Sequence, residues 1–129
     1  RIFAIEGRTV SVAAEGFRLQ RPNGITWDQA SNRFLLAPFG GTALRGWTPG
    51  AATADSLAAG PGMQDGIEVL NGQTLVSSWA DSTIFVMDAS GPRKLITGVT
   101  SPADIGVDQV RGLVAIPLFL ENRVEVWQV

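Results

Sequence analysis

The chain has 129 residues, a formal net charge of −2, and 45% hydrophobic and 17% charged residues, which is the balance of a single globular domain. This charge provides no basic surface of the kind that nucleic-acid binding requires, so we expect no DNA or RNA partner. Histidine and cysteine are both absent, which excludes Ser-His-Asp and Cys-His nucleophiles, His-based zinc sites and disulfides.

Short runs rich in Ile, Val, Phe, Leu and Thr follow one another along the chain, separated by Gly, Pro, Asn and Asp, and this pattern predicts consecutive antiparallel strands. Asn71-Gly72 is a strong hairpin signal between two of these runs. No helical stripe interrupts the pattern, so we predict an all-β fold. In chain order, the expected strands are 1–7, 8–16, 24–28, 33–38, 43–48, 55–60, 66–70, 74–79, 83–88, 93–99, 104–108, 113–118 and 123–128.

The runs belong to a repeat. RPNGITWDQASNRF at 21–34 returns as SPADIGVDQVRGLV at 101–114, an offset of 80 residues, and Gly66-Ile67 stands 42 residues after Gly24-Ile25. The repeating unit is therefore about 40 residues long, which is the signature of a repeat architecture. The offset of 80 pairs Pro22 with Pro102, Ile25 with Ile105, Asp28 with Asp108, Phe39 with Phe119 and Trp47 with Trp127.

The third strand of the middle unit, TIFVMD at 83–88, is apolar on both faces, which implies a sheet covered on both sides. Four-stranded units of this length are typical of β-propeller blades, whereas a sandwich would alternate apolar and polar residues along most strands. We predict one partial propeller domain over 1–129. Its expected parts are the last two strands of a preceding blade (1–20), two complete blades (21–60 and 61–100) and three strands of a final blade (101–129).

About three blades do not close a ring, and uncovered apolar faces of this size are poorly tolerated in a monomer. The chain also begins at Arg1, without a methionine and inside an expected strand, so we interpret it as a partial chain. We expect either a missing amino-terminal half or a second copy to close the ring. Two copies would supply more strands than six four-stranded blades hold, so one strand of each copy would be displaced.

No run of 18 apolar residues and no signal-peptide pattern is present in the chain. We therefore expect a soluble protein with no membrane partner, and the sequence leaves its compartment open.

The words PNGITWD, DGIEVL, TLVSSW, SPADIGVD and PLFLENRVEVW resemble the carboxyl-terminal half of the SMP-30/gluconolactonase/LRE-like six-bladed propellers. The resemblance covers nearly the whole chain, and NHL-repeat propellers share many of these short words. It implies a six-bladed ring in which an amino-terminal segment supplies the outer strand of the last blade.

In that family a divalent cation lies on the propeller axis, held by a Glu, one or two Asn and an Asp that begin innermost strands. The resemblance places the Asn on Asn23 and the Asp on Asp65, both as metal ligands, and the remaining ligands before Arg1. It also implies that Asp65 is catalytic and takes a proton from the attacking water. We expect Ca²⁺, with Mg²⁺, Mn²⁺ or Zn²⁺ as alternatives, because hard cations prefer oxygen ligands.

A bound cation polarises a lactone carbonyl and lowers the pKa of water, a route that needs no histidine. The alternative interpretation of Asn23-Gly24 and Asp65-Gly66 is that both are turn pairs. Asp104 aligns with the two glycines rather than with the ligands, since Ala103 holds the ligand position. Asp104 therefore either lines the central channel or belongs to a turn before the last innermost strand.

Other conspicuous residues are interpreted as structural. The expected turn residues are Asp28 and Asp108, the expected blade-packing residues are Trp47 and Trp127, and Ser77 and Ser78 are strand residues with no base to activate them. Trp79 could either pack between blades or form a platform for a ligand.

Three functions remain. The first is a metal-dependent hydrolase that opens a small lactone or sugar-acid-like ester, active only when the ring is complete and inactive as this chain alone. The second is a non-catalytic, NHL-type scaffold that binds a ligand or protein. The third is a half-propeller that assembles with itself, since symmetric dimers are the commonest oligomers.

Overall fold

A computed structural model describes residues 1–129 and is built of antiparallel sheets, so the all-β prediction is confirmed. The only helical segment is the 3-10 turn η1 (Phe17–Leu19), and no helix of the chain is long and apolar enough to cross a membrane. The strands are β1 (Ile2–Glu6), β2 (Thr9–Ala14), β3 (Pro22–Asp28), β4 (Arg33–Pro38), β5 (Ala43–Trp47), β6 (Asp55–Ala59), β7 (Gln64–Leu70), β8 (Gln73–Ser78), β9 (Thr83–Asp88), β10 (Gly91–Thr97), β11 (Gly106–Asp108), β12 (Leu113–Leu118) and β13 (Arg123–Gln128).

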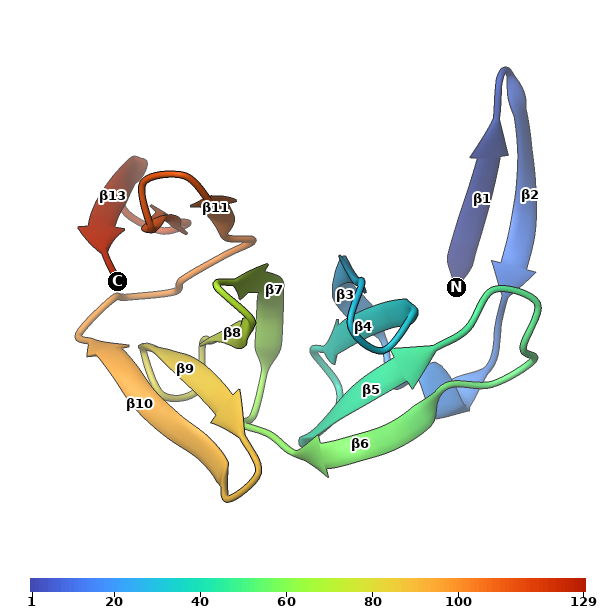
Figure 1. Cartoon of the computed structure of the whole chain (residues 1–129), viewed down its shortest axis with the longest axis horizontal. Coiled ribbons are helices and arrows are strands. Elements are labelled where there is room, and N and C mark those ends of the chain that lie inside the picture. Colours follow the sequence, from blue (N-terminus) through green and yellow to red (C-terminus); the bar gives the residue numbers. More distant parts are fainter.

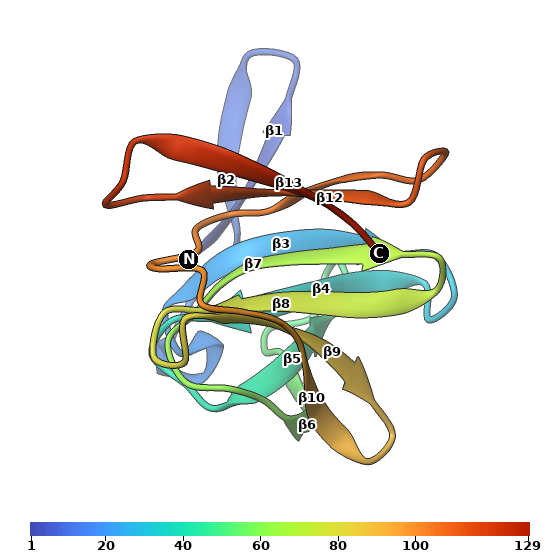
Figure 2. The same ribbon diagram turned by 90° about the vertical axis from the view of Figure 1, so that its left-hand side faces the viewer.

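The strands form four separate sheets, each made of neighbours along the chain. They are the hairpin β1–β2, a first four-stranded sheet β3–β6, a second four-stranded sheet β7–β10 and a three-stranded sheet β11–β13. Figure 1 shows them side by side along an arc, with β3 and β7 on its inner side and β6 and β10 on its outer side. In Figure 2 β3 and β7 run alongside one another, and β7 also lies against β11.

Every strand lies within two residues of its expected bounds, and the differences at the starts of β10 and β11 have a clear cause. β10 begins at Gly91 rather than at residue 93, because Gly91 and Pro92 already pair with Asp88 and Met87 of β9. A proline is tolerated there since β10 is an edge strand. β11 begins at Gly106 rather than at residue 104, because the chain leaves the ladder after an isolated bridge between Pro102 and Leu118.

The core consists of three hydrophobic clusters, each lying between two successive sheets. The cluster between the two four-stranded sheets includes Leu35, Ile67 and Phe85, and the next cluster includes Ile84 and Ile116. The third lies between the β1–β2 hairpin and the first four-stranded sheet. Because alternate residues of β9 enter different clusters, this strand is buried on both faces, as its sequence predicts.

The two sheets at the ends of the arc have uncovered apolar faces. In the β1–β2 hairpin, which projects from the rest of the molecule in Figure 1, Ile5 is 71% exposed. On β13, Val124 and Val126 are 59% and 63% exposed. The expectation of uncovered faces at both ends is therefore confirmed by these side chains.

The two tryptophans expected in blade packing differ in their surroundings. Trp47 is buried in the cluster beside the hairpin, stacks on Phe34 with 5.8 Å between ring centroids, and donates its indole N–H to the carbonyl of Ala51. Trp127, at the equivalent place, is 41% exposed and donates to Glu125. The packing prediction is confirmed for Trp47, whereas Trp127 stays partly exposed although it pairs with the buried Val114 of β12.

The turn role expected for Asp28 and Asp108 is confirmed. The Asp28 carboxylate accepts hydrogen bonds from the backbone of Ala30 and Ser31, and the Asp108 carboxylate accepts from the backbone N–H groups of Val110 and Arg111. These contacts stabilise the turns that follow Asp28 at the end of β3 and Asp108 at the end of β11.

Candidate functional site

The three innermost strands contain the same irregularity at the same place. Between Pro22 and Gly24, β3 advances two residues while its partner advances one. Between Gln64 and Ile67, β7 advances three residues against two. From Pro102 to Gly106 the chain advances four residues against three. Each strand thus carries one extra residue, a bulge of the kind that redirects side chains beside functional sites.

The bulges lie at the residues singled out in the sequence: Asn23 in the first sheet, Asp65 and Gly66 in the second, and the Ala103–Asp104 segment in the third. Asn23-Gly24 and Asp65-Gly66 therefore lie inside strands β3 and β7, and the turn interpretation of these pairs is wrong. Neither glycine has a positive φ angle.

Close packing explains the two glycines instead. A Cβ atom on Gly24 would collide with the backbone carbonyl oxygen of Asp65, and one on Gly66 would lie 2.9 Å from the carbonyl oxygen of Ala103. Glycine at this position therefore lets each innermost strand approach the next. This approach brings Asn23, Asp65 and Asp104 to one end of the inner strands.

The three polar side chains meet there. Burial raises the pKa of the Asp65 carboxyl, and the negative charge of Asp104 adds to the rise. The indole of Trp79 and the side chain of Asn23 approach the carboxyl and lower its pKa in part. Partial burial also raises the pKa of Asp104, although its side chain is exposed by surface area. Neither aspartate takes part in an ion pair.

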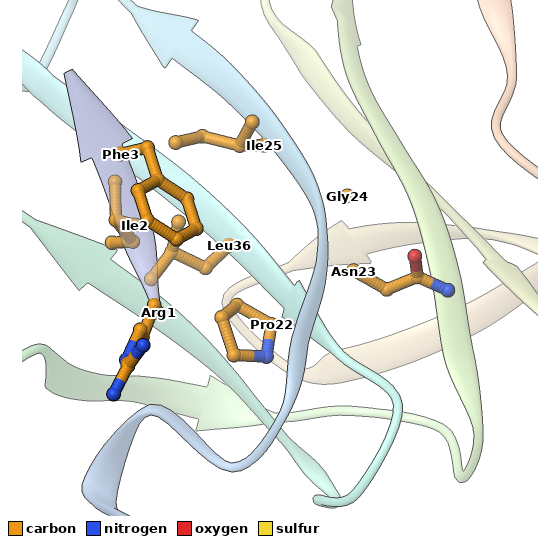
Figure 3. A pocket seen from close by; sticks show the side chains of 8 residues that line it. All are labelled: Arg1, Ile2, Phe3, Pro22, Asn23, Gly24, Ile25 and Leu36. Carbon is orange, nitrogen blue, oxygen red and sulfur yellow. The ribbon is translucent and has the colours of Figure 1, made fainter. Parts of the chain in front are cut away.

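A cavity of about 170 Å³ lies on the other side of β3, between this strand and β1. Figure 3 shows the Asn23 side chain pointing away from the apolar residues Ile2, Phe3 and Leu36 that line it. Asn23 borders this cavity, but its side chain points to the opposite side of β3.

Trp79 directly follows β8 and is half-buried. Its indole N–H is near enough to the Asp65 carboxyl to lower the pKa, yet this buried nitrogen has no hydrogen-bond partner of good geometry. The backbone N–H of Trp79 donates to the carbonyl oxygen of Met63, two residues before Asp65, at 3.1 Å. We therefore assign Trp79 to the site, a role that the sequence left open.

Ser77 fastens the bulge that carries Asp65. Its fully buried hydroxyl accepts a hydrogen bond from the backbone N–H of Gly66, at 2.7 Å, and donates to the carbonyl oxygen of Ala103, at 2.9 Å. The hydroxyl of Ser78 donates to the carbonyl oxygen of Gly62. Both hydroxyls are thus engaged with the backbone, in agreement with the structural interpretation of these serines.

One carboxylate near the inner strands escaped the sequence analysis. Glu68 of β7 accepts a hydrogen bond from the Thr26 hydroxyl of β3, at 3.0 Å. Thr26 and Glu68 are separated by the same 42 residues as Asn23 and Asp65, so the repeat could have signalled them as a cross-strand pair. Their contact ties the two strands together beyond the bulges.

The available oxygen donors are few. Asn23, Asp65 and Asp104 offer one amide and two carboxylates, and nowhere in the chain do three or more His, Cys, Asp or Glu side chains form a group suited to a metal. Two neighbouring carboxylates without a cation are the kind of donors that a hard divalent ion prefers. They are fewer than the six to eight oxygens that Ca²⁺ usually takes, so further ligands or waters would have to complete the shell.

A comparison of the chain with protein-family models and with curated proteins found no match.

Proposed function

We propose that the four sheets are blades of a six-bladed β-propeller of the SMP-30/gluconolactonase type, and that the chain contributes half of a divalent-metal site for the hydrolysis of lactones or related esters. Successive four-stranded sheets with a core between each pair support the blade interpretation. The observation that carries the site is the meeting of Asn23, Asp65 and Asp104 at equivalent bulges of adjacent inner strands.

Asn23 and Asp65 would hold the ion directly, and Asp104 would add negative charge beside it. The ion, Ca²⁺ or alternatively Mg²⁺, Mn²⁺ or Zn²⁺, would polarise the ester carbonyl and acidify a water molecule. Asp65 would accept the proton of that water, the general-base role that a carboxylate beside an activated water can take. Trp79 would orient the Asp65 carboxyl through its indole N–H.

Calorimetric titration of the complete ring, in which the remaining ligands are present, with Ca²⁺ and with Mn²⁺ tests the proposal. We expect saturable binding that weakens at least tenfold in Asn23→Ala and Asp65→Asn. Asp55→Asn, which changes an exposed carboxylate on the outermost strand β6, is the matched control and should bind like the wild type. An absence of binding heat in the wild type would reject the hydrolase proposal.

The small number of donors favours a second candidate, a non-catalytic propeller that binds a ligand or another protein at this end of the inner strands. In that case neither the wild type nor Asp65→Asn would bind metal, and Asp65→Asn would still bind the ligand measurably. The exposed faces of β1–β2 and β13 support the third candidate, assembly of two copies into one ring, and the molar mass in solution distinguishes it from the other two.

A further inference from the structure

An aromatic row runs across the sheets at the end where the candidate site lies. Phe39, Trp79 and Phe119 follow the second strands of their sheets at a constant spacing of 40 residues. The ring centroids are 5.9 Å apart for Phe39 and Trp79 and 5.5 Å apart for Trp79 and Phe119. We call these three side chains the aromatic row.

The backbone holds the aromatic row by one repeated hydrogen bond. The N–H groups of Phe39, Trp79 and Phe119 donate to the carbonyl oxygens of Arg21, Met63 and Ser101, at 3.0 to 3.1 Å. All three acceptor residues have a positive φ angle, between 47° and 56°. Left-handed backbone at non-glycine residues is strained and clusters at ligand-binding sites.

The aromatic row adjoins the candidate site directly, because its central member is Trp79, whose indole N–H lies near Asp65. A shallow groove of about 420 Å³ continues from Phe39, lined by Gln20, Phe39, Gly40, Gly41, Thr42, Gly62 and Met63. Phe119 and Met63 are 64% and 40% exposed. The aromatic row and Met63 thus place apolar surface beside the carboxylates, next to groove residues that are glycine or polar.

The polar groups around the aromatic row are few and partly occupied. The side-chain oxygen of Gln20 accepts a hydrogen bond from Arg45 at 3.1 Å, and the guanidinium of Arg21 lies over the ring of Phe39, 5.8 Å from its centroid. The three rings themselves offer no hydrogen-bonding group except the indole N–H of Trp79, whereas a sugar ring needs several donors and acceptors for its hydroxyls. An alkyl chain needs only apolar contact.

We propose that the aromatic row is a binding subsite for the apolar tail of a neutral lactone or ester whose ring or carbonyl lies toward Asp65. The proposal rests on the proposed function for the lactone head and adds the chemical class of the remainder of the ligand. It replaces the sugar-acid-like ligand expected from the sequence with one that carries an alkyl chain.

Binding of two lactones that differ only in their tail tests this subsite. γ-Decanolactone has a hexyl chain on the ring of γ-butyrolactone, and each fully buried methylene is worth about fourfold in affinity. We expect γ-decanolactone to bind at least tenfold more tightly than γ-butyrolactone or D-glucono-δ-lactone. Saturation-transfer NMR in EDTA measures this without metal, so that loss of metal binding and loss of the subsite remain separate results.

Variants of the aromatic row locate the binding. Phe119→Ala and Phe39→Ala should each weaken γ-decanolactone at least fivefold while leaving Mn²⁺ binding unchanged, and Phe119→Leu should retain most of the affinity. Val126→Ala, which trims an exposed apolar side chain on β13, is the matched control for non-specific adsorption. Equal affinity for the two γ-lactones, a stronger response to the sugar lactone, or equal losses in Phe119→Ala and Val126→Ala would overturn the proposal.

Discussion

At the scale of single residues, the chain keeps two carboxylates together without a neutralising cation. Asp65 is 9% exposed, and the negative charge of Asp104 adds to the effect of burial in raising its pKa. The arrangement costs stability at neutral pH, since both groups are ionised there. Unfavourable charge placement of this kind is typical of functional sites, where removing it stabilises the fold.

Asp104→Asn should therefore stabilise the protein at pH 7 in EDTA. We expect the free energy of unfolding in urea to rise by about 0.5 kcal/mol, a small value because Asp104 is exposed and solvent screens the pair. Asp108→Asn is the opposite control. The hydrogen bonds from Arg111 hold the pKa of Asp108 below its usual value, so removing its charge should destabilise the turn.

The stabilising effect of Asp104→Asn depends on pH. A carboxyl with a raised pKa binds its proton more tightly in the folded state than in the unfolded state. The free energy of unfolding therefore increases as the pH falls through the raised pKa toward the ordinary value of 3.8. The advantage of Asp104→Asn should disappear over that interval. An unchanged advantage at pH 3 would contradict the assignment of the effect to charge repulsion.

At the scale of elements, the site depends on how closely β7 approaches the segment that leads into β11. A Cβ on Gly66 would lie 2.8 Å from the Cα of Asp104 and 2.9 Å from the carbonyl oxygen of Ala103. Both neighbours are backbone atoms, which cannot move aside as a side chain can. The hydroxyl of Ser77 bridges the same two segments.

Gly66→Ala should consequently lower the unfolding free energy by about 1 to 3 kcal/mol, the usual cost of overpacking. It should also weaken any Mn²⁺ binding, because Asp65 and Asp104 would be pushed apart. Gly106→Ala provides the control, since nothing lies within 4 Å of the Cβ position there. Urea unfolding and calorimetry of both variants give the comparison, and equal stability of the two would refute close approach as the reason for Gly66.

The apolar runs and the turn signals between them were sufficient to predict every strand to within two residues, even where the strand is largely exposed, as β2 and β13 are. It predicted neither the bulges nor the left-handed conformations of Arg21, Met63 and Ser101. Arginine, methionine and serine have no preference for that conformation. It accompanies the hydrogen bond that the carbonyl oxygen of each residue accepts from the backbone N–H of Phe39, Trp79 or Phe119. The contact of Thr26 with Glu68 likewise depends on strand placement and not on local sequence.

At the scale of the whole molecule, each pair of neighbouring sheets is joined by its own hydrophobic cluster, so the fold is a chain of similar interfaces. Stability in such an arrangement is approximately a sum over units and the contacts between neighbours. The end sheets each lack one of these contacts, and their apolar residues are exposed as a result.

This 129-residue chain, when prepared alone, should therefore associate with itself. Sedimentation velocity is expected to show species heavier than the 13.7 kDa monomer, in proportions that increase with protein concentration. Val126→Lys should shift the distribution toward the monomer because it places a charge on the exposed face of β13. A wild-type chain that stays monomeric at high concentration would show that these faces are stable in water.

The hydrogen bonds at Arg21, Met63 and Ser101 use only main-chain atoms. The three positions can thus carry a cation, a thioether and a hydroxyl without altering the scaffold beneath them. Single substitutions at these three positions can therefore change the side-chain chemistry beside the aromatic row while the backbone hydrogen bonds stay in place. New ligand preferences could arise here in this way without loss of the fold.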